Sequence, residues 1–361
     1  MNIQRSPLSL AALAALCAAA TAVPAAAAVD TSKWTCELCP AEAGSSLSGE
    51  LEAGIGATTD ESATFGNYTG LQRKGAHAVV GGGLRWRGAD GLYGSVAARD
   101  LGLDTRQLAA EFGQEGRFRA RMGYAEIPRH VAEGALTPFT GVGGSVLRLP
   151  AGYPALNTGA MPLTATLQPV DLQTRRKRLD ADLSWALGTD WDLRLLARHE
   201  VKDGLQRLSG SFFSTAAQLP APVDQTIDSV EAAAVYTRGA LHASVGAHAS
   251  WFRNGNDSLV WTNPFLSGNP GATRGELALA PDNQFLQLNA AAAFSFSPAL
   301  RVSGDLAWGQ MTQDAAFRAA TLNPALAVTL PSASLDGRVD VFNANLRMSA
   351  QPVDGVRVNA S

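Results

Sequence analysis

The sequence predicts an all-β protein, a transmembrane antiparallel β-barrel, and three observations support that prediction. Segments of alternating apolar and polar residues mostly run for about ten residues, the length that a tilted strand needs to cross a bilayer. The connections between these segments alternate between short and long. Charged residues make up only 17% of the 361-residue chain, whereas soluble domains carry roughly 25%, so much of the surface is expected to face something other than water.

The N-terminus predicts a secretory signal peptide over residues 1–28. Arg5 gives a positive start, residues 8–23 are apolar, and Pro24 is followed by alanines that offer a cleavage site after Ala28. The alternative is a retained transmembrane helix, against which Pro24 and the small residues after it argue. Beyond residue 28 no run of 18 or more apolar residues remains, so any later membrane crossing is expected to use strands.

Residues 29–45 are expected to form a short periplasmic segment that contains the C-x-x-C pair Cys36 and Cys39. Covalent haem attachment needs C-x-x-C-H, and Pro40 stands where the histidine would be. Structural zinc needs four ligands and a thioredoxin-like site needs a βαβ context, and the surrounding sequence favours neither. A disulfide and a redox-responsive thiol pair both remain open.

A partial outer-membrane barrel is expected over residues 46–361. In 116–124, 174–187, 241–251 and 285–296, apolar side chains occupy every second position and polar or small ones the positions between. The predicted strands cover 46–58, 76–88, 91–101, 104–113, 116–127, 173–187, 190–208, 226–238, 240–252, 284–297, 299–312, 338–351 and a last one from 355 onward.

The lengths of the connections sort by their order along the chain. Alternate connections are short, at 88–90, 114–116, 188–190, 238–240, 297–299 and 352–355. The others are long, at 59–75, 128–172, 209–225, 253–283 and 313–337, except for a tight link near Gly102. Outer-membrane barrels alternate short periplasmic turns with long outer loops, whereas a soluble sandwich has no reason to do so.

Aromatic residues on the apolar faces lie within a few residues of the short turns. This placement favours a girdle at the periplasmic membrane interface over core aromatics, which would spread along the strands. The residues are Trp86, Phe112, Phe118, Trp185, Trp191, Tyr236, Phe294 and Phe296.

The opposite face collects the charges, is dominated by arginine and is expected to line the lumen. The candidate partner-contacting residues are Arg85, Arg87, Arg99, Arg117, Arg119, Arg121, Arg176, Arg178, Arg194 and Arg198, and the same face includes Arg301 and several acids. Such a wall could be that of a water-filled porin, which the residues alone favour slightly. It could also grip an enclosed partner, because guanidinium groups hold carboxylates and haem propionates well.

The number of strands favours the enclosed partner. About thirteen strands are predicted, whereas bacterial barrels usually have an even number and an open edge in lipid would leave backbone groups unpaired. We therefore expect this sequence to be a piece, or an early stop, of a larger barrel. Barrels of more than about twenty strands tend to be plugged.

Other function classes are disfavoured. With 29 Lys and Arg against 32 Asp and Glu, the chain lacks the basic surface that a nucleic-acid partner requires. The sequence contains neither a G-x-S-x-G nor an H-E-x-x-H motif. One modest cluster, His130 with Arg129 and Glu133, is expected in a solvated loop. The protein is therefore predicted not to be an enzyme.

Five stretches carry a family resemblance. They are DTSKWTCELCP (30–40), SATFGNYTGL (62–71), LYGSVAARDLGLDTRQL (92–108), GYAEIPRH (123–130) and LTPFTGVG (136–143). Together they resemble the decahaem-associated outer-membrane proteins of the MtrB/PioB family, and the W-x-C-x-x-C-P stretch is the most specific of them. The resemblance implies a barrel of about 26 strands in full-length members, which is at the large end of bacterial barrels.

The resemblance also implies a function in the outer membrane of a Gram-negative cell. The barrel would be a porin-like sheath that holds a periplasmic multihaem c-type cytochrome and so supports electron transfer across the membrane. It would bind no haem covalently, since the partner carries the haem, and it would contact outer-membrane lipid and, where one is present, an outer-surface multihaem cytochrome. The alternative, which rests on the barrel pattern alone, is a general porin or substrate channel without a cytochrome.

Overall fold

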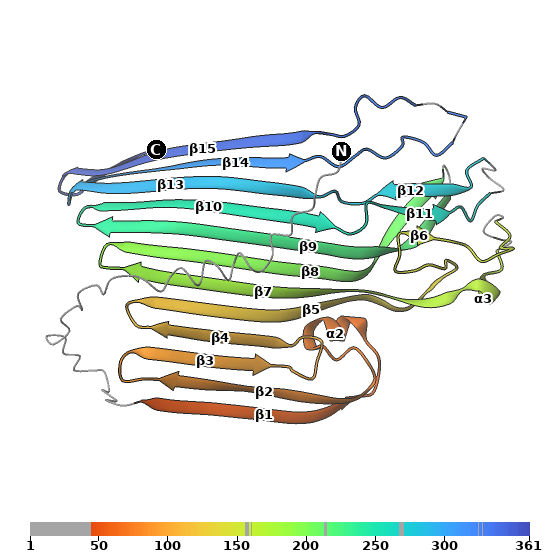
Figure 1. Ribbon diagram of the computed structural model, residues 1–361, viewed down its shortest axis with the longest axis horizontal. Coiled ribbons are helices and arrows are strands. Elements are labelled where there is room, and N and C mark those ends of the chain that lie inside the picture. Colours follow the sequence, from red (N-terminus) through yellow and green to blue (C-terminus); the bar gives the residue numbers. More distant parts are fainter. Residues whose placement is uncertain are drawn as a thin grey trace, which may run out of the picture. The chain divides into compact units, whose positions relative to one another are not determined.

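A computed structural model describes residues 45–361 except 156–158, 160, 213–214, 267–270, 324 and 327. A 13-stranded sheet dominates it, with neighbouring strands antiparallel and in chain order apart from the loop strands β6, β11 and β12 (Figure 1). The strands are β1 (Ser46–Thr58), β2 (Gly75–Arg87), β3 (Leu92–Arg99), β4 (Gln107–Gln114), β5 (Phe118–Thr137), β7 (Gln168–Leu187), β8 (Trp191–Phe212), β9 (Thr215–Arg238), β10 (Leu241–Asn254), β13 (Asn283–Ser297), β14 (Leu300–Gln313), β15 (Gly337–Val353) and β16 (Val356–Ala360). The described strands form an open wall with β1 and β16 at its edges.

The thirteen predicted strands are confirmed one for one. The short connections gather at one end of the sheet, which we call the short-turn end, and the long connections gather at the other, the long-loop end (Figure 1). Gly188 and Gly239 allow two of the short turns, because their φ angles of 67° and 56° lie in the left-handed region. No helix in the described part of the chain has the length and apolar character to span a membrane.

The long connections contain elements that the alternation did not predict. The β1–β2 connection holds α2 (Ala63–Thr69), and the β5–β7 connection holds β6 (Val146–Leu147) and α3 (Leu163–Thr166). The β10–β13 connection holds β11 (Ser258–Thr262) and β12 (Arg274–Ala278), which form a small sheet with β6 in the order β12-β11-β6.

The prediction of loops at 128–172 and 209–225 is wrong over much of their length. The strands β5, β7, β8 and β9 extend beyond their expected ends into these ranges. The pairing of β8 with β9 continues to Phe212 and Thr215. Alternation fails there, since consecutive residues of β9 are buried by the long-loop elements. Pro220 and Pro222 are tolerated in this stretch because β10 pairs with β9 only as far as Gln225, which leaves an edge where no ladder hydrogen bond is lost.

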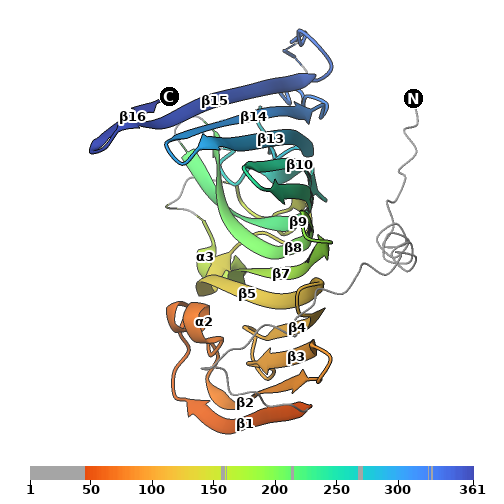
Figure 2. The same ribbon diagram turned by 90° about the vertical axis from the view of Figure 1, so that its left-hand side faces the viewer.

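His130 lies in β5 and is buried, which corrects the prediction of a solvated loop. β3 and β4 have only 8 residues each, and β4 pairs with β5 no further than Ala125. Helix α2 packs against β5 beyond that point (Figure 2). The Asn67 side chain accepts a hydrogen bond from the His130 backbone N at 2.6 Å and donates one to its O at 3.0 Å. The Asn67 side chain thus takes the place of a neighbouring strand at His130. With this position of β5 covered by α2, β3 and β4 can be short and joined by the tight link near Gly102, the exception among the long connections.

Asn67→Ala is expected to free α2 from the wall. The substitution leaves the backbone N–H and C=O of His130 without partners, at a cost of about 1–3 kcal/mol for each group that stays buried. Hydrogen exchange should accelerate at His130 and through α2. Asn283→Ala is the matched control, because the exposed Asn283 side chain makes one hydrogen bond, to the Pro281 O. Equal exchange at His130 in the two variants would contradict this account of α2.

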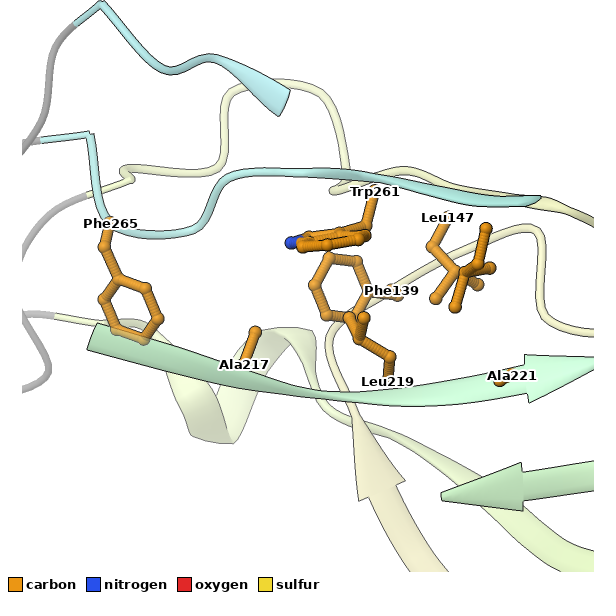
Figure 3. Packing of buried hydrophobic residues seen from close by; sticks show 8 residues of the cluster. Phe139, Leu147, Ala217, Leu219, Ala221, Trp261 and Phe265 are labelled. Carbon is orange, nitrogen blue, oxygen red and sulfur yellow. The ribbon is translucent and has the colours of Figure 1, made fainter. Parts of the chain in front are cut away.

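The hydrophobic core cluster of the described residues lies at the long-loop end, where the loop elements cover the start of β9. We call its eight residues the outer cluster: Phe139, Leu147, Ala217, Leu219, Ala221, Leu259, Trp261 and Phe265 (Figure 3). The Trp261 ring is held between two glycines, since a Cβ on Gly210 or Gly275 would lie 2.2 or 2.3 Å from its ring atoms. The cluster therefore ties the ends of β8 and β9 to the β11–β12 hairpin.

Candidate functional site

The candidate site is the polar face of the sheet, which we call the lumen face. Register places the predicted arginines of the strands on this one face. For example, Arg85 pairs with Ser95, Ser95 with Glu111 and Glu111 with Arg121. Arg117 lies in the turn before β5. The structure thus brings the ten predicted arginines to one face or its rim.

Five of these arginines form ion pairs with carboxylates of their own or neighbouring strands. Asp180 lies at the centre, 2.8 Å from the Arg178 Nε and 2.7 Å from the Arg198 Nε. The remaining pairs are Arg121–Glu111 at 2.5 Å, Arg176–Glu200 at 3.1 Å and Arg119–Asp182 at 4.0 Å. Partly exposed pairs contribute up to about 1 kcal/mol each, so these arginines mainly neutralise and order the wall.

The remaining five predicted arginines have fewer polar partners in the wall. Arg87 pairs with Glu115 at 3.0 Å beside the short turns, and Arg117 donates to the Gln114 side chain at 3.0 Å. Arg85, Arg99 and Arg194 form no ion pair within the described residues. Arg347, which the sequence analysis did not single out, also lies on the lumen face, opposite Ser303. Its position in the alternation of β15 with Asn343 and Asn345 is the signal that could have identified it.

The opposite face of the sheet is apolar, and it is bounded by aromatic residues at the short-turn end and by charged residues at the long-loop end. At the short-turn end the predicted aromatics lie on this face, and some of them form ring pairs: the centroids are 4.8 Å apart for Trp191–Tyr236 and 5.6 Å for Phe112–Phe118. On β7 the apolar face runs from Leu187 to Leu179. That stretch spans about 21 Å along the barrel axis for a tilt of ~40°, comparable to the apolar band of about 25 Å in outer-membrane barrels.

A charged belt bounds the apolar face at the long-loop end. On β7 the next residue on this face is Lys177, which lies 3.8 Å from Asp203. On β8 to β10 the belt continues with His199, whose Nδ1 is 2.7 Å from Asp228, and Arg253, 3.5 Å from the same carboxylate. Charged groups are costly in the middle of a bilayer and far less so at its interface. The apolar face therefore contacts lipid between the aromatic residues and this belt, and the polar face lines the lumen.

Two predicted features lie outside the described residues: the signal peptide at 1–28 and the pair Cys36 and Cys39. In the part of the chain that the structure describes, no group of three or more His, Cys, Asp and Glu side chains could hold a metal ion.

Solved outer-membrane proteins give low-similarity structural matches. The ferric yersiniabactin uptake receptor FyuA from Yersinia pestis is 11% identical, with a TM-score of 0.42 over 88% of this chain and 46% of that one. OmpT of Vibrio cholerae is 11% identical, with a TM-score of 0.32 over 73% of this chain and 67% of that one. TM-scores this low do not establish a shared fold.

Sequence comparison gives the stronger result. "Outer membrane protein MtrB" of Shewanella baltica is 29% identical over 335 residues, which cover 92% of this chain and 47% of that protein. The chain therefore spans about half the length of this curated relative. The model of the outer-membrane β-barrel porin family MtrB/PioB matches residues 57–361, most of the chain and nearly all of the described sheet. The chain belongs to the MtrB/PioB family of outer-membrane β-barrel porins.

Proposed function

We propose that this outer-membrane barrel is a porin-like sheath that holds a periplasmic multihaem c-type cytochrome in its lumen. The sheath supports electron transfer across the membrane without catalysing a reaction or binding haem covalently. Family membership and the likeness to MtrB support this proposal. The haem groups belong to the enclosed cytochrome, and the barrel supplies insulation from lipid and a polar wall around it.

The observation that carries the proposal is the uneven neutralisation of the lumen face. Acids of the wall neutralise Arg121, Arg178 and Arg198. Arg85 and Arg194 on the same face form no ion pair among the described residues. Guanidinium groups left unpaired in a lumen are available to carboxylates of an enclosed partner, and such charge-assisted hydrogen bonds are stronger than neutral ones.

A general porin for small solutes is the second candidate function. The ion-paired part of the wall favours it, because a wall that neutralises itself through acids such as Asp180 and Glu200 needs no partner. The two functions differ in whether a haem protein remains with the barrel.

Affinity purification of the tagged, full-length protein from outer membranes of its own host tests the proposal. A haem-staining protein is expected to co-purify in a ratio near one to one and to survive washing at ~150 mM salt, at which the Debye length is about 8 Å. An unrelated tagged porin from the same membranes is the control. Recovery of the barrel without haem, from cells that produce multihaem cytochromes, would contradict the sheath and favour the porin.

A further inference from the structure

A pocket of about 450 Å³ opens on the lumen face near the short-turn end, between β14, β15 and β16. Five of its polar side chains belong to these strands: Arg301, Ser303, Arg347, Ser349 and Asn359. Register places all five on the lumen face: Arg301 pairs with Ser349, Ser303 with Arg347, and Ser349 also with Asn359. The sheet therefore fixes the positions of these five residues.

The two arginines of this pocket are diagonal neighbours. Each lies directly opposite a serine, so the Cα atoms of Arg301 and Arg347 are about 7–8 Å apart, a separation across which long side chains can converge. Two guanidinium groups and the Ser303, Ser349 and Asn359 side chains thus present hydrogen-bond donors to a common space.

No Asp or Glu side chain is among the residues that line this pocket. The nearest acid on the lumen face, Asp305, accepts a hydrogen bond from the Asn345 side chain at 2.8 Å, and it forms no ion pair with Arg347 within the described residues. Like charges on neighbouring strands destabilise a sheet. Elsewhere on the same face the wall resolves this conflict, since Asp180 lies between Arg178 and Arg198. Between Arg301 and Arg347 no Asp or Glu side chain of the described residues holds the corresponding position.

We propose that the pocket of Arg301 and Arg347 is a carboxylate-binding site at the periplasmic mouth of the lumen. A carboxylate placed between the two guanidinium groups would occupy the position that Asp180 holds in the other pair, and it would accept further hydrogen bonds from the serines and Asn359. Its source is an acidic side chain or haem propionate of the enclosed cytochrome, and this part rests on the proposed function.

Chemical modification tests the site without any partner. Phenylglyoxal labels arginines of the purified full-length barrel, and mass spectrometry follows each labelled peptide. We expect ~10 mM citrate to slow labelling of Arg301 and Arg347 at least 5-fold, relative to chloride at equal ionic strength. Labelling of Arg85 and Arg194, which are single unpaired arginines of the same face, should change less than 2-fold. Equal protection of all four arginines, or protection of none, would overturn the site.

A second experiment tests the source of the carboxylate. R301Q/R347Q is expected to lower the co-purified haem at least 10-fold at ~150 mM salt. The matched variant R253Q/R338Q removes the same charge from the long-loop end, outside the lumen, and should retain the haem protein. Unchanged recovery in R301Q/R347Q would overturn the cytochrome as the source. If the wild-type barrel itself carries no haem protein, the proposed function fails, while citrate protection still decides the site.

Discussion

Arginine in place of Ala290 is expected to prevent stable assembly of the barrel in the outer membrane. Ala290 lies midway along β13 on the apolar face, with Val245 and Leu306 as its cross-strand neighbours. A guanidinium group at this depth would face hydrocarbon, at a cost of about 2–4 kcal/mol relative to alanine. That cost is large against the total stability of a folded protein, which is about 5–15 kcal/mol for a typical domain.

The adjacent residue provides the matched control for this prediction. Ala291→Arg makes the same change one position along β13, on the lumen face, where the cross-strand neighbours are Ser244 and Asp305. We expect this variant to assemble as well as the wild type, because the new guanidinium group is hydrated and lies opposite a carboxylate. The measurement is the amount of barrel in outer membranes and its urea midpoint in lipid vesicles. Similar losses in the two variants would refute the assignment of the faces.

Trp261→Ala is expected to unfold the outer cluster and leave the wall intact. Trp261 is 3% exposed and packs between Gly210 and Gly275, and the Phe212 ring contacts it edge-on at 5.9 Å. Truncation of a buried tryptophan costs about 3–5 kcal/mol, and the small outer cluster has few other buried side chains to offset this loss.

Protease added to intact cells measures this effect, since the outer cluster lies at the long-loop end. Cleavage within 138–167 and 255–282 is expected to accelerate at least 10-fold in Trp261→Ala, while the membrane-embedded strands stay protected. Phe317→Ala is the control, because Phe317 is an aromatic residue of another long connection and is 40% exposed. Gly210→Val should reproduce the effect of Trp261→Ala, since a Cβ at this position would overlap the tryptophan ring. Unchanged cleavage in both variants would show that the cluster is not a cooperative unit.

The strands of the sheet could be predicted from the sequence because each strand has lipid on one face and the polar lumen on the other. These two environments impose an alternation of apolar and polar residues with a period of two. In β10, for example, Leu241 and Val245 face lipid while His242 and Ser244 face the lumen. The lengths of the connections then fix which end of each strand is periplasmic. Where a third environment intervenes, this signal fails: residues 219–223 of β9 are buried in succession by the long-loop elements.

The candidate site was predictable as a face but not as a set of contacts. Alternation assigns Arg178 and Arg198 to the lumen, yet only the register shows that both approach Asp180. The same holds for Arg301 and Arg347, which are 46 positions apart in the sequence and become diagonal neighbours through the pairing of β14 with β15. The contact of Asn67 of α2 with β5, which takes the place of a neighbouring strand, leaves no periodic pattern in the sequence. It depends on the early end of β4, which only the structure shows.

Site-specific photocrosslinking in living cells tests the central claim, an enclosed multihaem cytochrome, most directly. A photoreactive residue at Asn289 would point into the lumen between the small neighbours Gly246 and Ala307. The same residue at Leu288 would point into lipid. The account predicts a haem-staining crosslinked product from position 289 and none from position 288. Absence of that product at position 289 in cells that produce the cytochrome, or equal yields at the two positions, would contradict it.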